Sequence, residues 1–220
     1  MKHPMKHPAK RENSDGFSVA LGLFDYINPI LYAVTSVTVI LYLRGRAAAP
    51  LFWLYVAGAA LSLGFGLAIP TVKLLVGLGR LRFEMPVGLV SYVNTGILLS
   101  GIALLCHVTG LGTVPLLGIL AAAAAVIALL WHKTGKFNTA AVLIGAVGYL
   151  MLYVSLILLA ARAAAVLPLV LYALAICLFV FLCLVGIASN LKNAKVHWVI
   201  EISNVICQLA VAVATVVLVG

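Results

Sequence analysis

Residues 197–208 read HWVIEISNVICQ and begin an apolar run that continues to Gly220. Four polar side chains in this run recur at helical spacing and therefore share one face of an α-helix. They are Glu201, Asn204, Gln208 and Thr215. The run is long enough to cross a bilayer, where carboxylate and carboxamide groups face protein or water rather than lipid. We therefore predict a transmembrane helix whose polar stripe, these four residues, faces the rest of the chain.

The composition of the whole chain predicts a polytopic membrane protein. Of its 220 residues, 65% are hydrophobic and 9% are charged, and its mean hydropathy is +1.24. A soluble domain with this ratio would expose a largely apolar surface. The apolar residues fall in runs of about 17 to 25, the length that spans a hydrocarbon layer of roughly 30 Å. We expect an all-α fold with the lipid bilayer as its surroundings.

Seven transmembrane helices are predicted, all within a single domain that covers residues 17–220. Their approximate ranges are 17–43, 50–69, 86–107, 114–131, 139–161, 166–188 and 197–220. Residues 1–16 form a basic tail with a tandem Met-Lys-His-Pro repeat and no pattern of a folded segment. The helix over 166–188 has little polar content, so we expect it to face lipid over most of its surface.

The distribution of basic residues predicts the orientation. Eleven of the 14 lysines and arginines lie in the tail and in the loops on the same side of the seven-helix arrangement. They are Lys2, Lys6, Lys10, Arg11, Lys73, Arg80, Arg82, Lys133, Lys136, Lys192 and Lys195. Because cytoplasmic loops carry such an excess, we predict a cytoplasmic-membrane protein with its N-terminus in the cytoplasm and Gly220 outside. The same excess explains the net charge of +9 without a nucleic-acid partner.

Pro29 is the one proline predicted inside a helix, since Pro70 and the others fall in the tail or near predicted helix ends. A proline removes a backbone donor and disfavours helical geometry in the preceding residue. We predict a kink or an unwound turn near Asn28. Four residues around this point share a helix face. They are Asp25, Asn28, Tyr32 and Thr35.

Three predicted helices carry a polar residue three positions before an asparagine. The pairs are Asp25 and Asn28, Ser91 and Asn94, and Glu201 and Asn204. All three helices run outward from the cytoplasm in the predicted orientation, so we expect a polar layer between the first, third and seventh helices. The candidate site consists of Glu201, Asn204, Gln208, Asn94, Ser91, Asn28 and Asp25.

Two functions fit this layer. Ionisable residues within transmembrane helices commonly mark ion, proton or substrate pathways, which favours a small transporter or channel-like carrier for a small solute or ion. Amides also join helices by hydrogen bonds, so the alternative is a non-catalytic subunit or assembly partner of a larger membrane complex. The sequence does not decide whether the protein forms a homo-oligomer. A third and weaker alternative is an intramembrane enzyme that acts on lipid-soluble substrates, because the chain has no Ser/His/Asp set, no H-E-x-x-H and no phosphate loop.

No cofactor or metal site is expected. The histidines considered as haem ligands, His107, His132 and His197, fall at helix ends and not in one layer of the bundle. The four cysteines form no C-x-x-C pair and read as buried apolar residues. No basic residue lies within a predicted helix, and we therefore expect Glu201 to pair with Asn28, Asn94 or water rather than with a buried lysine or arginine.

An internal repeat is also indicated. Residues 46–49 and 162–165 both read RAAA, and each precedes a predicted helix with a tyrosine at a similar distance, Tyr55 and Tyr172. Helices one to three would then correspond to five to seven as parallel repeats, with helix four as linker. This 3+1+3 plan is similar to that of sugar transporters of the SWEET type. Their Pro-Gln signature is absent and the predicted orientation is the reverse, so the resemblance covers only architecture.

Overall fold

A computed structural model describes residues 18–81, 87–134, 137–188 and 194–219. Within these ranges the chain is helical and contains no strand, which confirms the all-α class. The helices are α1 (Val19–Asp25), α2 (Ile27–Leu43), α3 (Ala49–Gly77), α4 (Val87–Thr109), α5 (Thr113–Thr134), α6 (Phe137–Arg162), α7 (Val166–Ala188) and α8 (Ala194–Val219). The basic tail over residues 1–16 lies outside the described residues.

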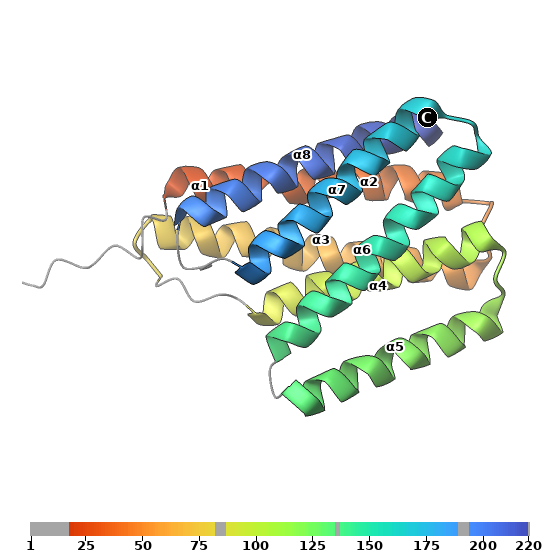
Figure 1. Ribbon diagram of the computed structural model, residues 1–220, viewed down its shortest axis with the longest axis horizontal. Coiled ribbons are helices and arrows are strands. Elements are labelled where there is room, and N and C mark those ends of the chain that lie inside the picture. Colours follow the sequence, from red (N-terminus) through yellow and green to blue (C-terminus); the bar gives the residue numbers. More distant parts are fainter. Residues whose placement is uncertain (1–17, 82–86, 135–136, 189–193, 220) are drawn as a thin grey trace, which may run out of the picture.

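Six helical segments of the described chain are long and apolar enough to cross a membrane. They are α1 together with α2, and then α3, α4, α6, α7 and α8. Figure 1 shows α5 running along the bundle as well, antiparallel to α4 and α6. Counted with α5, and with α1 and α2 as one pass, the described helices run along the bundle seven times, and α8 ends on the side opposite to the start of α1 (Figure 1).

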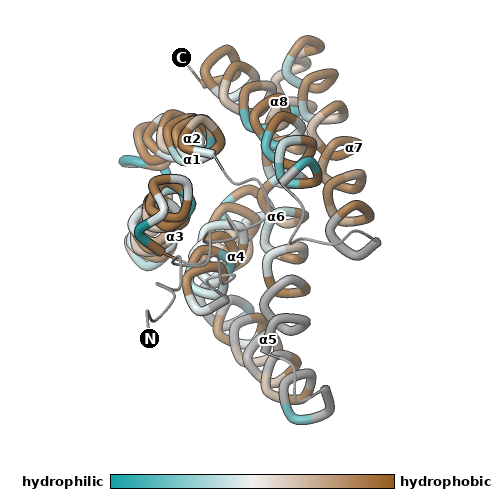
Figure 2. The backbone as a smooth tube through the Cα atoms, turned by 90° about the vertical axis from the view of Figure 1, so that its left-hand side faces the viewer, coloured by the Kyte–Doolittle hydropathy of each residue, from teal (hydrophilic) through white to brown (hydrophobic). Residues whose placement is uncertain are grey.

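The helices form a closed ring. In this ring α2 packs against α3 and α8, α3 against α4, α4 against α6, α6 against α7, and α7 against α8. Among the described helices, α1 continues into α2 and packs against α3, whereas α5 lies outside the ring, beside α6 and α4 (Figures 1 and 2). The order of the helices in the ring follows the order of the sequence, as expected for a chain with short connections.

Apolar side chains cover the outside of the ring, as a lipid environment requires. The helix α7 is the least covered of the six candidate spans, with 17% of its most apolar window buried, which agrees with the lipid-facing role predicted for it. Figure 2 shows α7 as mostly hydrophobic along its length. Its one buried polar group is Tyr172, whose hydroxyl lies 3.0 Å from the hydroxyl of Thr215 on α8. Thr215 thus ends the polar stripe inside the bundle.

The predicted break near Pro29 is confirmed, two residues before Asn28. The helix is interrupted at Tyr26, which separates α1 from α2. Pro29 has no amide hydrogen, so the carbonyl of Asp25 loses its usual partner four residues on. The backbone angles of Tyr26 remain helical, and the two segments follow each other without a loop. The break is therefore the loss of a backbone hydrogen bond within an otherwise helical segment, and not an unwound turn.

The predicted end of the second helix near Pro70 is wrong. The helix α3 continues through Pro70 for seven further residues, and Lys73, which was predicted to lie in a loop, lies inside it. Transmembrane helices tolerate proline because neighbouring groups compensate for the lost donor. The true stop is Gly79, whose positive φ of 69° allows the amides of Gly79 and Arg80 to bond back to carbonyls in the last turn of the helix.

Glycines bring α3 very close to two neighbouring helices. A Cβ atom at Gly22 of α1 would lie 2.7 Å from the backbone of Leu74, so these helices touch backbone to backbone. Between α3 and α4, a Cβ at Gly58 would lie 2.6 Å from the carbonyl oxygen of Gly96. Small residues at these positions allow the helix backbones to approach this closely. The first of these contacts sets the position of the site described next.

Candidate functional site

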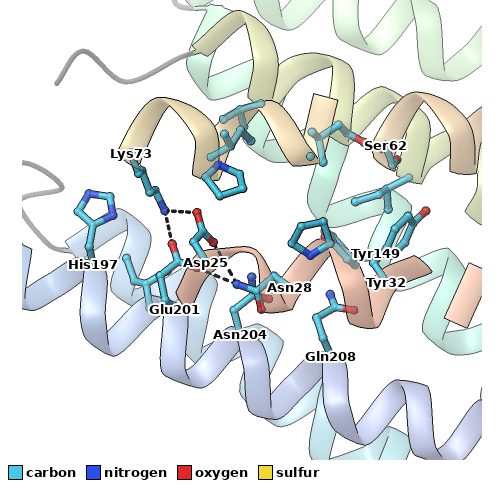
Figure 3. A pocket seen from close by; sticks show the side chains of 18 residues that line it. Asp25, Asn28, Tyr32, Ser62, Lys73, Tyr149, His197, Glu201, Asn204 and Gln208 are labelled. Atoms are coloured by element: carbon cyan, nitrogen blue, oxygen red, sulfur yellow. Dashed lines mark hydrogen bonds and ion pairs between the residues drawn. The ribbon is translucent and has the colours of Figure 1, made fainter. Parts of the chain in front are cut away.

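Three charged side chains from three helices meet inside the bundle, and we call them the charged cluster: Asp25, Lys73 and Glu201. The ammonium nitrogen of Lys73 lies 2.8 Å from Oδ2 of Asp25 and also pairs with Oε1 of Glu201. The three residues are 5%, 6% and 5% exposed, respectively. Figure 3 shows Lys73 reaching down from α3 between the two carboxylates. Lys73 therefore bridges the two carboxylates, and all three side chains lie almost entirely out of contact with the surroundings.

Asn28 joins the two carboxylates on the side away from Lys73. Its amide nitrogen donates to Oε2 of Glu201 at 2.8 Å and to Oδ1 of Asp25 at 3.2 Å. Each carboxylate thus forms an ion pair with Lys73 through one oxygen and accepts a hydrogen bond from Asn28 through the other (Figure 3). Hydrogen bonds to charged groups are roughly twice as strong as those between neutral groups. This arrangement fixes the orientation of both carboxylates.

Local sequence explains how these side chains meet. The contact between Gly22 and Leu74 brings α1 against α3, and Asp25 lies one helical turn beyond Gly22, beside Lys73. At the break between α1 and α2, the Tyr26 hydroxyl lies 2.6 Å from the Thr71 hydroxyl of α3 and ties the helices together there. The third charge comes from α8, which packs against both α1 and α2.

A cavity of about 330 Å³ borders the charged cluster. Its polar lining beyond the cluster is contributed by Asn28, Tyr32, Ser62, Tyr149, His197, Asn204 and Gln208. Prolines and aliphatic side chains of α2, α3, α4 and α8 complete the wall. Figure 3 shows the charged cluster at one end of the view, and Tyr32, Tyr149 and Gln208 at the other. The cavity therefore changes from charged to mainly apolar and aromatic along its length.

Two amides in the wall have no protein partner. Asn204 and Gln208 both line the cavity, and within the part of the chain that the structure describes neither makes a hydrogen bond. The side-chain oxygen Oδ1 of Asn28 is also buried, and it has no hydrogen-bond partner among the described residues. Buried amides are normally satisfied by protein or by water. These groups are therefore placed to bond water or a ligand inside the cavity.

The predicted site residues separate into two groups. The cavity is lined by Asp25, Asn28, Glu201, Asn204 and Gln208. The other two predicted residues, Ser91 and Asn94, are absent from its lining and lie on α4. Asn94 packs against Gly145, where an added Cβ would lie 2.5 Å from its side chain. The side chain of Asn94 thus contributes to the contact between α4 and α6.

Of the two predictions about the partners of Glu201, one is confirmed and one is wrong. Asn28 donates to it, as expected, but the expectation of no buried lysine or arginine is wrong because Lys73 pairs with it directly. Sequence reasoning missed Lys73 because Pro70 was read as a helix end. A signal was present: residues 71–76 read TVKLLV, which continues the apolar run past the proline. Tyr32 lies on the helix face predicted with Asp25 and Asn28, although it was not included in the candidate site. Ser62, Tyr149 and His197 were missed as lining residues, since no spacing rule connects their helices.

Comparisons with protein-family models, with curated protein sequences and with solved structures gave no match for this chain. The function is therefore argued from the site alone. Among the described residues, no three His, Cys, Asp or Glu side chains come together as a metal site. What the geometry offers is a pair of carboxylates aimed at one cation, with amide and hydroxyl groups along an adjoining cavity.

Proposed function

We propose that this protein is a small integral-membrane carrier whose substrate, a small solute or ion, binds in the cavity beside the charged cluster. In this proposal α5 is the seventh transmembrane helix. Substrate sites of carriers commonly lie between helices within the membrane, often next to an interrupted helix. Here the α1–α2 break, the buried charges and the cavity coincide.

The observation that carries the proposal is the pair of unsatisfied amides in the cavity wall. Side chains that only join helices would bond each other across the interface, as Tyr172 and Thr215 do. Asn204 and Gln208 instead face open space on the same helix face as Glu201. A pathway needs polar groups that are free to bond what passes, and these two amides meet that need.

One observation favours the alternative of a non-catalytic membrane subunit. The charged cluster is internally paired and nearly fully buried, as expected of groups that hold α1, α3 and α8 together. The two functions differ in whether water and solutes reach the cavity. They also differ in whether access changes from one membrane face to the other.

We further propose that the N-terminus is cytoplasmic, that Gly220 is external and that the protein resides in the cytoplasmic membrane. Moving Lys73 from a loop into α3 leaves the excess of basic residues on the same side. The charged cluster then lies in the cytoplasmic half of the bundle, near the start of α8 and the end of α3.

Cysteine accessibility tests the carrier proposal. In a chain whose four cysteines are replaced by alanine, Asn204→Cys is treated with a membrane-impermeant thiol reagent from one side of the membrane at a time. The matched control is Val213→Cys on the exposed face of the same helix, where lipid keeps the thiol unreactive. We expect Asn204→Cys to react from both sides and Val213→Cys from neither. Reaction of Asn204→Cys from no side, or from one side only, would contradict a carrier.

A further inference from the structure

In the charged cluster, the ammonium group of Lys73 lies between two carboxylates. The Lys73 ammonium group carries three N–H donors, and its two resolved partners are carboxylates on α1 and α8, two different helices from its own. Asn28 holds the outer oxygens of both carboxylates from behind. The protein therefore presents two oriented carboxylates to one ammonium group, which at present is supplied by its own chain.

We infer that the substrate of the proposed carrier is a primary amine. Its ammonium group displaces that of Lys73 from between Asp25 and Glu201, and its apolar or aromatic body occupies the cavity towards Tyr32 and Tyr149. This inference rests on the proposed function and names its substrate class.

The balance of charge favours a cation over an anion. The cluster contains two carboxylates and one lysine, and the other lining side chain that can become a cation is His197, which adds a positive charge only when protonated. An anion would meet two carboxylates in a buried site, where like charges repel strongly. An ammonium compound would instead replace one cation by another and leave the net charge of the occupied carboxylates unchanged.

Lys73 also explains how the empty site remains stable. A carboxylate pair without a cation is costly within a membrane. When no amine is bound, Lys73 pairs with both carboxylates and offsets one of their two negative charges. When an amine binds, the long lysine side chain is free to withdraw towards the end of α3, four residues from the last helical position. The lysine thus acts as a tethered competitor of the substrate.

The shape of the cavity limits the size of the amine. Its volume of about 330 Å³ suits a small molecule. Beyond the cluster its wall is formed by apolar side chains such as Val93 and Ile97 together with the rings of Tyr32 and Tyr149. Asn204 and Gln208 remain available for a further polar group on the substrate.

The first test removes the side chain of Lys73 and supplies the missing atoms as a free small amine. Lys73→Ala removes three methylenes and the ammonium group, which n-propylammonium supplies again. We expect n-propylammonium to raise the thermal unfolding temperature of the detergent-solubilised full-length Lys73→Ala chain. Neutral 1-propanol and anionic propionate should leave that temperature unchanged. In Lys73→Ala/Glu201→Gln, which lacks one carboxylate, the stabilisation should be lost. Stabilisation by 1-propanol equal to that by the amine would overturn the inference.

The second test uses the wild-type chain and holds even where Lys73→Ala does not fold. Binding of phenethylammonium is measured by calorimetry to the wild-type and Glu201→Gln chains. We expect binding to the wild type and at least about tenfold weaker binding to Glu201→Gln, because this substitution replaces one of the two carboxylates by a neutral amide. Where Lys73→Ala folds, it should bind at least about tenfold more tightly than the wild type, because a tethered competitor acts at millimolar effective concentration or above.

Equal affinity for the wild type and Glu201→Gln, or no binding to either, would overturn the inference. Its failure is distinct from failure of the carrier proposal. If Asn204→Cys reacts from both sides and amines do not bind, the carrier stands and the substrate class falls. If amines bind at Glu201 and Asn204→Cys reacts from neither side, an ammonium site exists without transport.

Discussion

Lys73 is the residue that changes the interpretation of the chain most. Two buried carboxylates without a cation would favour their neutral forms, and the site would then resemble a cluster of hydrogen-bonding groups. With Lys73 between them, the site is ionic and its geometry is fixed by charge. Buried ion pairs are weak contributors to stability, because well-packed apolar residues often serve as well or better. A cluster of this kind beside a cavity therefore fits the binding role that we propose for it.

Asn28 provides a test of how the carboxylates are held. Asn28→Leu keeps the approximate volume and removes the donor shared by Asp25 and Glu201, so we expect the free energy of unfolding to fall by about 1.5–3 kcal/mol. The control is Asn204→Leu, which removes an amide that bonds no described residue and should change stability by less than about 1 kcal/mol. Unfolding in mixed micelles measures both. An equal effect of the two substitutions would show that Asn28 is not the bridging donor.

At the scale of the helices, periodicity predicted most of the elements. Polar stripes on residues 25–35 and 201–215 face inward, as the avoidance of lipid requires, and six of the seven predicted helices agree with the observed ones to within a few residues. The exception is α3, because proline ends helices in water more reliably than it does in a membrane. That one boundary hid Lys73 and with it the ionic character of the site.

Contacts between helices were not available from periodicity. Asn94 has the same local pattern as Asn28 and Asn204, yet it packs against Gly145 on α6. Which helix faces which depends on the close approaches that glycines allow, and these are set in three dimensions. The sequence showed that Asn94 faces protein, and nothing in it showed which neighbour it meets.

The glycine contacts give a prediction at the same scale. At Gly58 an added Cβ would lie 2.6 Å from the Gly96 carbonyl oxygen, whereas at Gly64 on the same helix it would meet nothing within 4 Å. We therefore expect Gly58→Ala to destabilise the protein by about 1–3 kcal/mol through overpacking. Gly64→Ala should be neutral or slightly stabilising, since alanine is the better helix former. Thermal unfolding in detergent compares them. Equal unfolding temperatures would contradict the close packing of α3 on α4.

The whole molecule is a ring of helices with α5 outside it. This arrangement is compatible with two three-helix units joined by a linker, and the internal repeat stays a prediction. The ring leaves room for the cavity, and the helices that carry the charged cluster, α1, α3 and α8, come from both ends of the sequence. The site therefore depends on closure of the ring, which brings α8 against α1 and α2.

The central claim is that charges from these helices act as one unit, and a double-mutant cycle tests it most directly. The free energy of unfolding is measured for the wild type, Lys73→Ala, Glu201→Gln and the double variant. Lys73→Ala should lose about 3–5 kcal/mol, because it leaves two buried carboxylates without a cation. In the double variant one of those carboxylates is neutral. The account therefore predicts a loss smaller than the sum of the two single losses by more than about 1 kcal/mol. The control pair, Lys73→Ala with Gln208→Ala, should be additive; additivity to within about 0.5 kcal/mol for Lys73 and Glu201 as well would contradict the account.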